Sequence, residues 1–391
     1  MVEISKHLFD STCRDVHCSV LIHPWGRSCW TSSIETYKNS FIGSAKFYIL
    51  VHLAQNLLKG KKMLKKKELM KAGEYYARST LLGALICGSI TTLSCSLRWL
   101  LGRKFTYYTY MLLPCTINGV FILLEPPKRR GLVINLFCNL VIEFWIRLLE
   151  RDGYLNMTKG KQTFMFMIGS AFLFYLMRLE GERGKRTPLL WLFRPDNVRR
   201  KTDDSQTACP HDGSCTKHIL KGAFTYFGVG FAFTMARVLS PRISTPLKAL
   251  ASVRRKDFNM GLFFASYIGI YRAVVCYLCR KQGYDSAMYA LPAGYLAGLS
   301  FLLKPSLGFA IASVTGAFKL YSTILYEKKI LTEKIPLPLI MYCLSQGLLF
   351  HSHNVHQDIC PQYVKKLMYS VSNGKSKIIL QQLLDTVGAA V

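Results

Sequence analysis

Charged residues are scarce in this chain of 391 residues, and acidic residues are the scarcer kind. Only 19% of the residues are charged, with 22 Asp and Glu against 51 Lys and Arg, whereas 50% are apolar. A soluble domain of ordinary composition carries about 25% charged residues. The shortage of charge, together with the apolar excess, predicts a membrane protein.

The sequence also lacks the motifs of common enzymes. No Gly-x-Ser-x-Gly, phosphate-binding loop or dinucleotide fingerprint occurs in a suitable context. His351, His353 and His356 follow the last apolar run, but membrane oxygenases hold two irons with several such histidine groups. We therefore expect these histidines to form a solvated cluster at the membrane interface, and we expect no cofactor and no catalysis.

Basic residues concentrate between the apolar runs. The segment Lys59–Lys71 contains seven lysines, and Lys128–Arg130 and Arg254–Lys256 are shorter basic runs. Loops of this kind contact anionic lipid headgroups. The net charge of +29 is therefore assigned to contact with the lipid bilayer and not to nucleic-acid binding.

The apolar segments predict an all-α polytopic membrane protein with two tandem repeats of four or five hydrophobic helices each. Gly83 in the first half corresponds to Gly261 in the second, and Pro114 corresponds to Pro292. The same number of residues separates the two members of each pair. Five spans per repeat would make the repeats inverted, whereas four would make them parallel, and the sequence leaves both open. The predicted division is a Cys/His-rich segment at 1–40, a first membrane repeat at 41–180, a basic linker at 181–217, a second membrane repeat at 218–356 and a tail at 357–391.

Three charged residues fall inside apolar runs. Arg272 lies midway along the run 261–279, and Glu143 and Arg147 lie four residues apart in the run 132–149. An ionisable group at membrane depth usually faces the interior of the bundle or a polar cavity. Glu143 and Arg147 can pair on one helix face, and Arg272 is expected either to form an ion pair between the repeats, with Glu143 a candidate partner, or to line a polar pathway.

Small residues recur every four positions in two neighbouring segments of the second repeat. Such stripes let helix backbones approach closely in a membrane. The predicted helix-packing residues are Ala290, Gly294, Gly298, Gly308, Ala312 and Gly316.

A short segment with cysteine and histidine precedes each predicted repeat. The first contains Cys13, His17, Cys18, His23 and Cys29; the second contains Cys209, His211 and Cys215, with His218 nearby. Thiolate and imidazole are good zinc ligands, which makes Cys209, His211 and Cys215 candidate metal ligands. The alternative is a turn with reduced cysteines or a local disulfide, so no metal is expected to be required.

The order of these features resembles the transmembrane protein 135 family. The resemblance rests on the Cys/His-rich segments, the turn 126–131, and the stretches Ser266–Arg272 and Ala293–Gly298. It implies a member of a family of peroxisomal and mitochondrial membrane proteins linked to lipid metabolism and organelle dynamics. That family is distantly related to the preprotein translocase channel subunits of mitochondria. Their motif is approximated by Lys281, Asp285, Ala293, Gly294 and Gly298, although lysine replaces the usual arginine and the gap between Asp285 and Ala293 is one residue too long.

The resulting prediction is a multi-pass protein of the peroxisomal membrane, the mitochondrial membrane or both. It would act in lipid metabolism and organelle dynamics, as a transporter or channel for a lipid or metabolite between two repeats. The alternatives are a structural or scaffold protein that recruits organelle membrane proteins, and a channel subunit of the translocase type. His7, Asp10 and Arg14 interrupt any secretory signal, and Asn156 begins the sequon Asn-Met-Thr close to an apolar run, so we expect it to be unmodified.

Overall fold

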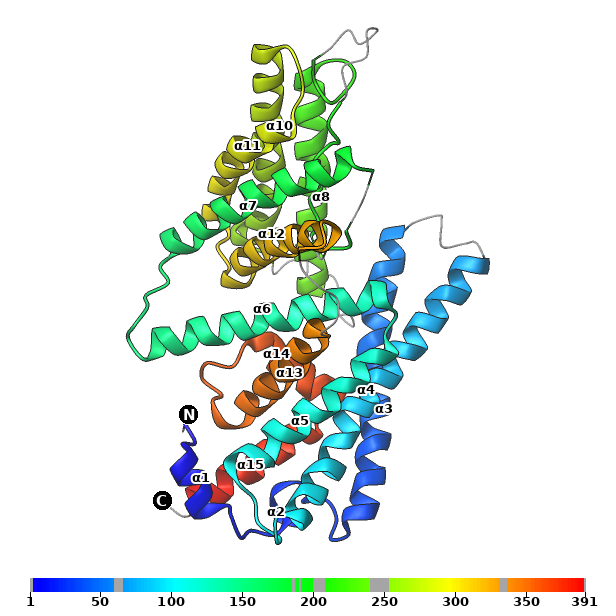
Figure 1. Ribbon diagram of the computed structural model, residues 1–391, viewed down its shortest axis with the longest axis vertical. Helices are drawn as coiled ribbons and strands as arrows, with labels where there is room; N and C mark the ends of the chain where they lie inside the picture. Colours follow the sequence, from blue (N-terminus) through cyan, green and yellow to red (C-terminus); the bar gives the residue numbers. More distant parts are fainter. Residues whose placement is uncertain are drawn as a thin grey trace. The chain divides into compact units, whose positions relative to one another are not determined.

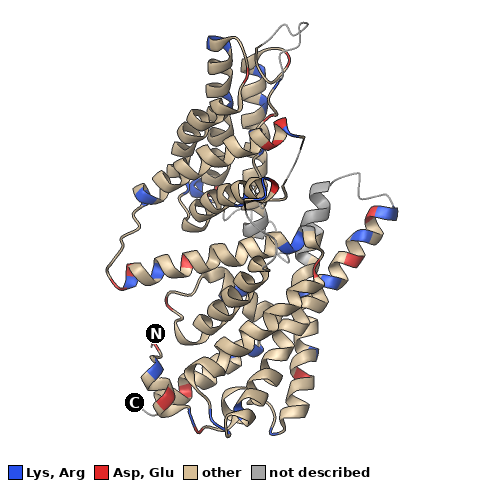
Figure 2. Cartoon of the chain, viewed as in Figure 1, with Lys and Arg blue, Asp and Glu red and all other residues tan. Residues whose placement is uncertain are grey.

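A computed structural model describes residues 3–59, 66–184, 187–189, 191–199, 208–239, 253–330 and 336–389, so part of the predicted basic segment 59–71 and of the linker 181–217 lies outside these residues. The described chain contains helices and no strand (Figure 1). Lys and Arg gather mainly toward helix ends and loops (Figure 2). The all-helical prediction is confirmed.

The chain forms two compact units, which do not coincide with the predicted repeats. The first unit contains residues 1–152 and 336–391, and the second contains residues 153–335. The predicted repeats divide the chain at 181–217 instead. The difference arises because one helix at the end of each predicted repeat packs in the other compact unit.

The described part of the first unit is built from eight helices and one interrupted helix. The helices are α1 (Lys6–Thr12), α2 (Cys18–Leu21), α3 (Cys29–Lys59), α4 (Lys66–Leu100), α6 (Pro127–Arg151), α13 (Leu337–Val355), α14 (Gln362–Val371) and α15 (Lys375–Gly388). The interrupted helix runs through η2 (Tyr108–Leu112), α5 (Leu113–Ile117) and η3 (Asn118–Leu124). The N-terminal α1 contacts the C-terminal α15, so both ends of the chain belong to this unit (Figure 1).

The second unit repeats much of this order. It contains α7 (Lys159–Glu182), α8 (Cys215–Leu239), η5 (Arg255–Phe258), α10 (Asn259–Gln282) and α12 (Leu307–Glu327). Its interrupted helix runs through η6 (Ala287–Tyr289), α11 (Ala290–Ala297) and η7 (Gly298–Leu303). Pro114 and Pro292 lie inside the two interrupted helices, where a missing N–H group weakens the regular hydrogen-bond ladder.

Five helices among the described residues are long and apolar enough to cross a membrane. They are α4, α6, α7, α10 and α12, counted over Lys66–Leu100, Arg129–Arg151, Lys159–Glu182, Arg255–Gln282 and Leu307–Glu327. The interrupted helices, Tyr108–Leu124 and Ala287–Leu303, are apolar but shorter. With several spans in one chain, the prediction of a multi-pass membrane protein is supported.

Each unit contains a pair of long helices in close contact. In the first unit α3 lies along α4, and a Cβ added to Gly83 would come within 2.6 Å of the Ser44 hydroxyl oxygen. In the second unit α8 lies along α10, and a Cβ added to Gly230 would come within 2.8 Å of Gly261 Cα. Backbone approach of this kind maximises van der Waals contact where lipid removes the hydrophobic drive between helices.

One further helix completes each unit by packing against the interrupted helix and the helix after it. In the second unit this is α7, which contacts α11, η7 and α12; in the first unit it is α13, which contacts α5, η3 and α6. The contacts are tight, since a Cβ on Gly298 would lie 2.6 Å from Met167 Cα and a Cβ on Gly119 would lie 2.8 Å from Cys343 Cα. α7 and α13 therefore fill equivalent places, although the chain reaches them from the other unit.

Candidate functional sites

Arg272 points toward the start of α8. Its Nη1 donates a hydrogen bond of 2.9 Å to the carbonyl oxygen of His218, and its Nε lies 3.6 Å from a carboxylate oxygen of Asp196. The side chain is 18% exposed. Its acidic partner is therefore Asp196 from the same unit and not the predicted Glu143, because the segment before α8 folds back over α10.

The space beside Arg272 is small. A cavity of about 10 Å³ is lined by residues that include Arg178, Asp196, His218, Tyr271 and Arg272. A volume of this size holds about one water molecule. Within the second unit, Arg272 therefore borders a hydration site and not a wide channel.

Glu143 and Arg147 form an ion pair along α6. Arg147 Nη2 and Nε lie 2.7 and 3.0 Å from Glu143 Oε1. The Arg147 side chain is 37% exposed and that of Glu143 is 14% exposed. The two charges thus neutralise one another at the surface of the helix.

The most deeply buried ion pair involves a residue that sequence reasoning missed. Arg178, near the end of α7, donates from Nη2 to both carboxylate oxygens of Asp285, at 2.7 Å for Oδ1, and from Nη1 to the carbonyl oxygen of Ser286. Both side chains are only 1% exposed. Asp285 also accepts a hydrogen bond from the backbone N–H of Arg199, so this carboxylate joins α7, the linker and the start of η6.

The predicted small-residue stripes occupy different environments. Gly294 and Gly298 face α7, where added Cβ atoms would come within 2.7 Å of the Ser170 carbonyl oxygen and 2.6 Å of Met167 Cα, and Ala290 is fully buried on the same segment. Gly316 faces Leu173 of α7. Gly308 and Ala312 are only half-buried, and α12 presents Ser313 to Gly169 of α7.

The histidine group at the end of α13 is buried and not solvated. His351 and His353 are 4% and 0% exposed, and their ring nitrogens have no hydrogen-bond partner among the described residues. The His351 ring packs edge-on against Tyr107 at 4.6 Å between centroids, and Tyr107 hydrogen-bonds to His356. The expectation of an interfacial cluster is wrong for His351 and His353, because α13 inserts into the first unit.

The candidate ligands Cys209, His211 and Cys215 lie together, and α10 adds Cys276 to them. Donor atoms of all four side chains lie within 4.8 Å of one another. The sulfur atoms of Cys209 and Cys215 are 3.6 Å apart, and His211 Nε2 is 3.3 Å from the sulfur of Cys276. Sequence reasoning missed Cys276 because it lies in an apolar run, where cysteine ordinarily serves as a small packing residue.

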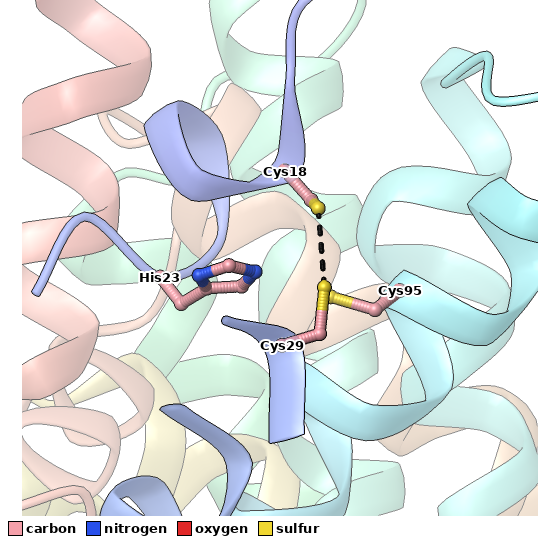
Figure 3. Close-up of side chains that lie close together, drawn as sticks. All are labelled: Cys18, His23, Cys29 and Cys95. Atoms are coloured by element: carbon pink, nitrogen blue, oxygen red, sulfur yellow. Dashed lines mark hydrogen bonds between the residues drawn. The ribbon is translucent and has the colours of Figure 1, made fainter. Parts of the chain in front are cut away.

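A second group of the same composition lies in the first unit. Cys18, His23, Cys29 and Cys95 converge with all donor atoms within 4.8 Å of one another (Figure 3). The sulfur atoms of Cys18 and Cys29 are 3.5 Å apart. Hydrogen bonds from Cys95, and further ones from His23 and Cys29, hold the pKa of the Cys18 thiol well below its usual range, although burial opposes this shift.

The first unit's Cys/His group lies in the part of the chain that matches a known family. Residues 15–149 match the model of the N-terminal cysteine-rich region of Transmembrane protein 135. This match supports the predicted family over that part of the chain. The transmembrane protein 135 region runs from just before α2 to near the end of α6, and it contains Cys18, His23, Cys29 and Cys95. No solved structure matches the chain.

Proposed function

We propose that this chain is a non-enzymatic structural protein of peroxisomal and mitochondrial membranes that acts in lipid metabolism and organelle dynamics. The family match and the five apolar helices support a multi-pass membrane protein. The organelles and the link to lipids come from the transmembrane protein 135 resemblance. In this proposal the chain recruits other organelle membrane proteins and transports nothing itself.

The observation that carries the structural alternative is the close packing of α7 against α11 and η7 in the second unit. Helix backbones meet directly at Gly294 and Gly298, and Arg178 and Asp285 neutralise one another inside. Arg272, the residue expected to line a pathway, is satisfied by Asp196 and the His218 carbonyl and borders only a water-sized cavity. A transporter needs a polar route, and this unit provides none of useful width along Arg272.

Basic segments between the helices are the proposed recruiting surfaces. Arg254, Arg255 and Lys256 precede α10, and Lys66, Lys67 and Lys71 lie at the start of α4. Each such charge near an anionic membrane contributes about 1 kcal/mol of attraction. The partners are therefore acidic lipid headgroups and acidic segments of membrane proteins.

A transporter remains the second candidate because of α13. Its last turns bury Gln346, His351, His353 and Asn354 in the first unit. Buried imidazoles without partners are unusual in a protein interior, and polar groups inside membrane helices often mark a route for ions or protons. In this candidate function, transport would pass through the first unit and not beside Arg272.

We also infer that the two units are tandem repeats that have exchanged their last helix. The contact of Ser44 with Gly83 between α3 and α4 corresponds to the contact of Gly230 with Gly261 between α8 and α10, and the two pairs are related by nearly equal offsets in the sequence. In the same way, the contact of Gly119 with α13 corresponds to that of Gly298 with α7.

The sequences of the exchanged helices agree with this correspondence. A single offset aligns Met165 with Met341, Leu173 with Leu349 and Phe174 with Phe350. The same offset aligns Met167 with Cys343, the two residues that meet Gly298 and Gly119. Each repeat would thus contain five helical elements, and the fifth element would pack in the other unit.

The proposed location predicts a protein that never enters the secretory lumen. A tagged copy should colocalise with peroxisomal or mitochondrial markers, and endoglycosidase should not shift its mobility. Asn156 is exposed in the loop before α7, so only its compartment or its nearness to the membrane protects it from modification. A sequon added after Ala389, away from the predicted spans, serves as the control. Signal confined to the Golgi or plasma membrane, or a glycan at either position, would contradict the proposal.

A further inference from the structure

The two Cys/His groups are built in the same way from the same elements. In each, a short segment supplies Cys, His and Cys in that order, and the second cysteine begins the first long helix: Cys29 begins α3 and Cys215 begins α8. In each, the fourth donor comes from the second helix of the pair. Cys95 and Cys276 both lie in the last two turns of their helices, α4 and α10. The same corner of two helix pairs therefore carries the same four donors.

The alignment of the two groups is close but not identical. The offset that relates Cys29 to Cys215 also relates Pro24 to Pro210. Gly83 and Gly261, in the two helix pairs, are related by a slightly smaller offset. That offset aligns Cys95 with Ala273, so Cys276 lies about one helical turn beyond the aligned position. The donor set is thus preserved although the helix position has shifted by one turn.

The spacing of the donors fits one tetrahedral ion. Zinc bound at about 2.3 Å from sulfur and about 2.0 Å from nitrogen places sulfur atoms about 3.8 Å apart and a sulfur and a nitrogen about 3.5 Å apart. The sulfur pairs Cys18–Cys29 and Cys209–Cys215 measure 3.5 and 3.6 Å, and His211 Nε2 lies 3.3 Å from the sulfur of Cys276. A cluster of two irons would place its ligand pairs on separate metals and spread them beyond the 4.8 Å that encloses each group.

His23 provides an independent indication. The residue is fully buried, and its Nδ1 lies 2.8 Å from the carbonyl oxygen of Gly26, to which it can donate a hydrogen bond. Its Nε2 is also buried and lies near the Cys18 thiol, outside the geometry of a regular hydrogen bond. In Figure 3 the imidazole lies beside the sulfurs of Cys18, Cys29 and Cys95. A ring nitrogen held by a backbone carbonyl while the other faces thiols is the arrangement of a metal-bound histidine.

We propose that each group binds one zinc ion through three thiolates and one imidazole. Four protein ligands leave no open position, so these are structural sites and not catalytic ones. One ion would fasten the segment before α3 to the end of α4, and the other would fasten the segment before α8 to the end of α10. Binding releases the thiol protons and adds its free energy to that of folding.

Metal analysis of the full chain tests this proposal. The protein is purified in detergent under reducing conditions without chelator, and zinc is counted per chain by inductively coupled plasma mass spectrometry. The wild type should hold about two zinc ions per chain. Cys95→Ser and Cys276→Ser should each lose one ion and the double variant both, whereas Cys138→Ser, a cysteine of α6 outside both groups, should keep two.

A second set of measurements separates loss of zinc from loss of fold. His23→Cys should retain the first ion because it replaces one zinc ligand with another, whereas His23→Ala should lose it. Wild-type protein exchanged with Co²⁺ should show the thiolate charge-transfer and ligand-field bands of tetrahedral cobalt. Iron in place of zinc, disulfides Cys18–Cys29 and Cys209–Cys215 in a parallel sample alkylated in the membrane and never reduced, or no metal in the folded wild type would each overturn the proposal.

Discussion

Asp285→Ala is expected to destabilise the second unit by about 3–5 kcal/mol, because it leaves the guanidinium of Arg178 buried without its carboxylate. Arg178 and Asp285 are each 1% exposed, and the cavity beside Arg178 holds only about one water molecule to replace the lost carboxylate. The backbone N–H of Arg199 loses its acceptor at the same time. The free energy of unfolding of the purified protein in mixed micelles, measured against denaturing detergent, would show the change.

The ion pair on α6 supplies the matched control. Arg147→Met removes the partner of Glu143, but the pair lies toward the end of α6 and Arg147 is 37% exposed, so the expected loss is smaller than that of Asp285→Ala. The double variant Arg178→Met/Asp285→Leu should recover most of the stability, since apolar residues of similar size often replace a buried pair without cost. A loss of unfolding free energy from Asp285→Ala that is no larger than the loss from Arg147→Met would contradict the buried ion pair.

The exchange of the last helices predicts a nearly complete cross-link between Gly119→Cys and the native Cys343. A Cβ on residue 119 would lie 3.2 Å from the Cβ of Cys343, so the helices need to separate by only about 0.6 Å to reach the usual 3.8 Å of a disulfide. A protease site inserted at Tyr154, which is 82% exposed between α6 and α7, would separate the two cysteines into different fragments. After mild oxidation in membranes and cleavage, the fragments should stay joined on a non-reducing gel.

The matched variant tests the opposite arrangement with the same cleavage. Gly119→Cys with Met167→Cys and Cys343→Ala places the second thiol on α7, which would pack against the first unit only if the helices were not exchanged. The fragments should then separate. A cross-link from residue 119 to residue 167, and none to residue 343, would contradict the exchange.

The sequence predicted the kinds of element better than their partners. The apolar runs predicted the helices well, since hydropathy reflects the local chain. Hydropathy did not indicate that α7 would pack in the second unit, nor that α13 would pack against α6 in the first unit. Met167 meets Gly298 and Gly119 meets Cys343 from distant parts of the chain, and the periodicity of either helix carries no information about that choice.

The same limit explains the missed site residues. Arg178 lies directly after the apolar residues 164–177, and Asp285 lies far from it in the sequence, so neither suggests the other. Cys95 and Cys276 lie inside long, mainly apolar helices, where cysteine ordinarily serves as a small packing residue. A useful signal was present, however: the second Cys/His segment offered three donors, and a closed zinc site requires a fourth.

Lipid flux tests most directly whether this chain is a structural protein or a transporter. The purified full chain is reconstituted into liposomes, and the movement of labelled phospholipids, fatty acids and small metabolites is compared with that in protein-free vesicles. The proposal predicts equal rates in the two preparations. Flux that requires the protein, and that His351→Ala with His353→Ala or Arg272→Leu abolishes while the chain remains folded, would contradict it.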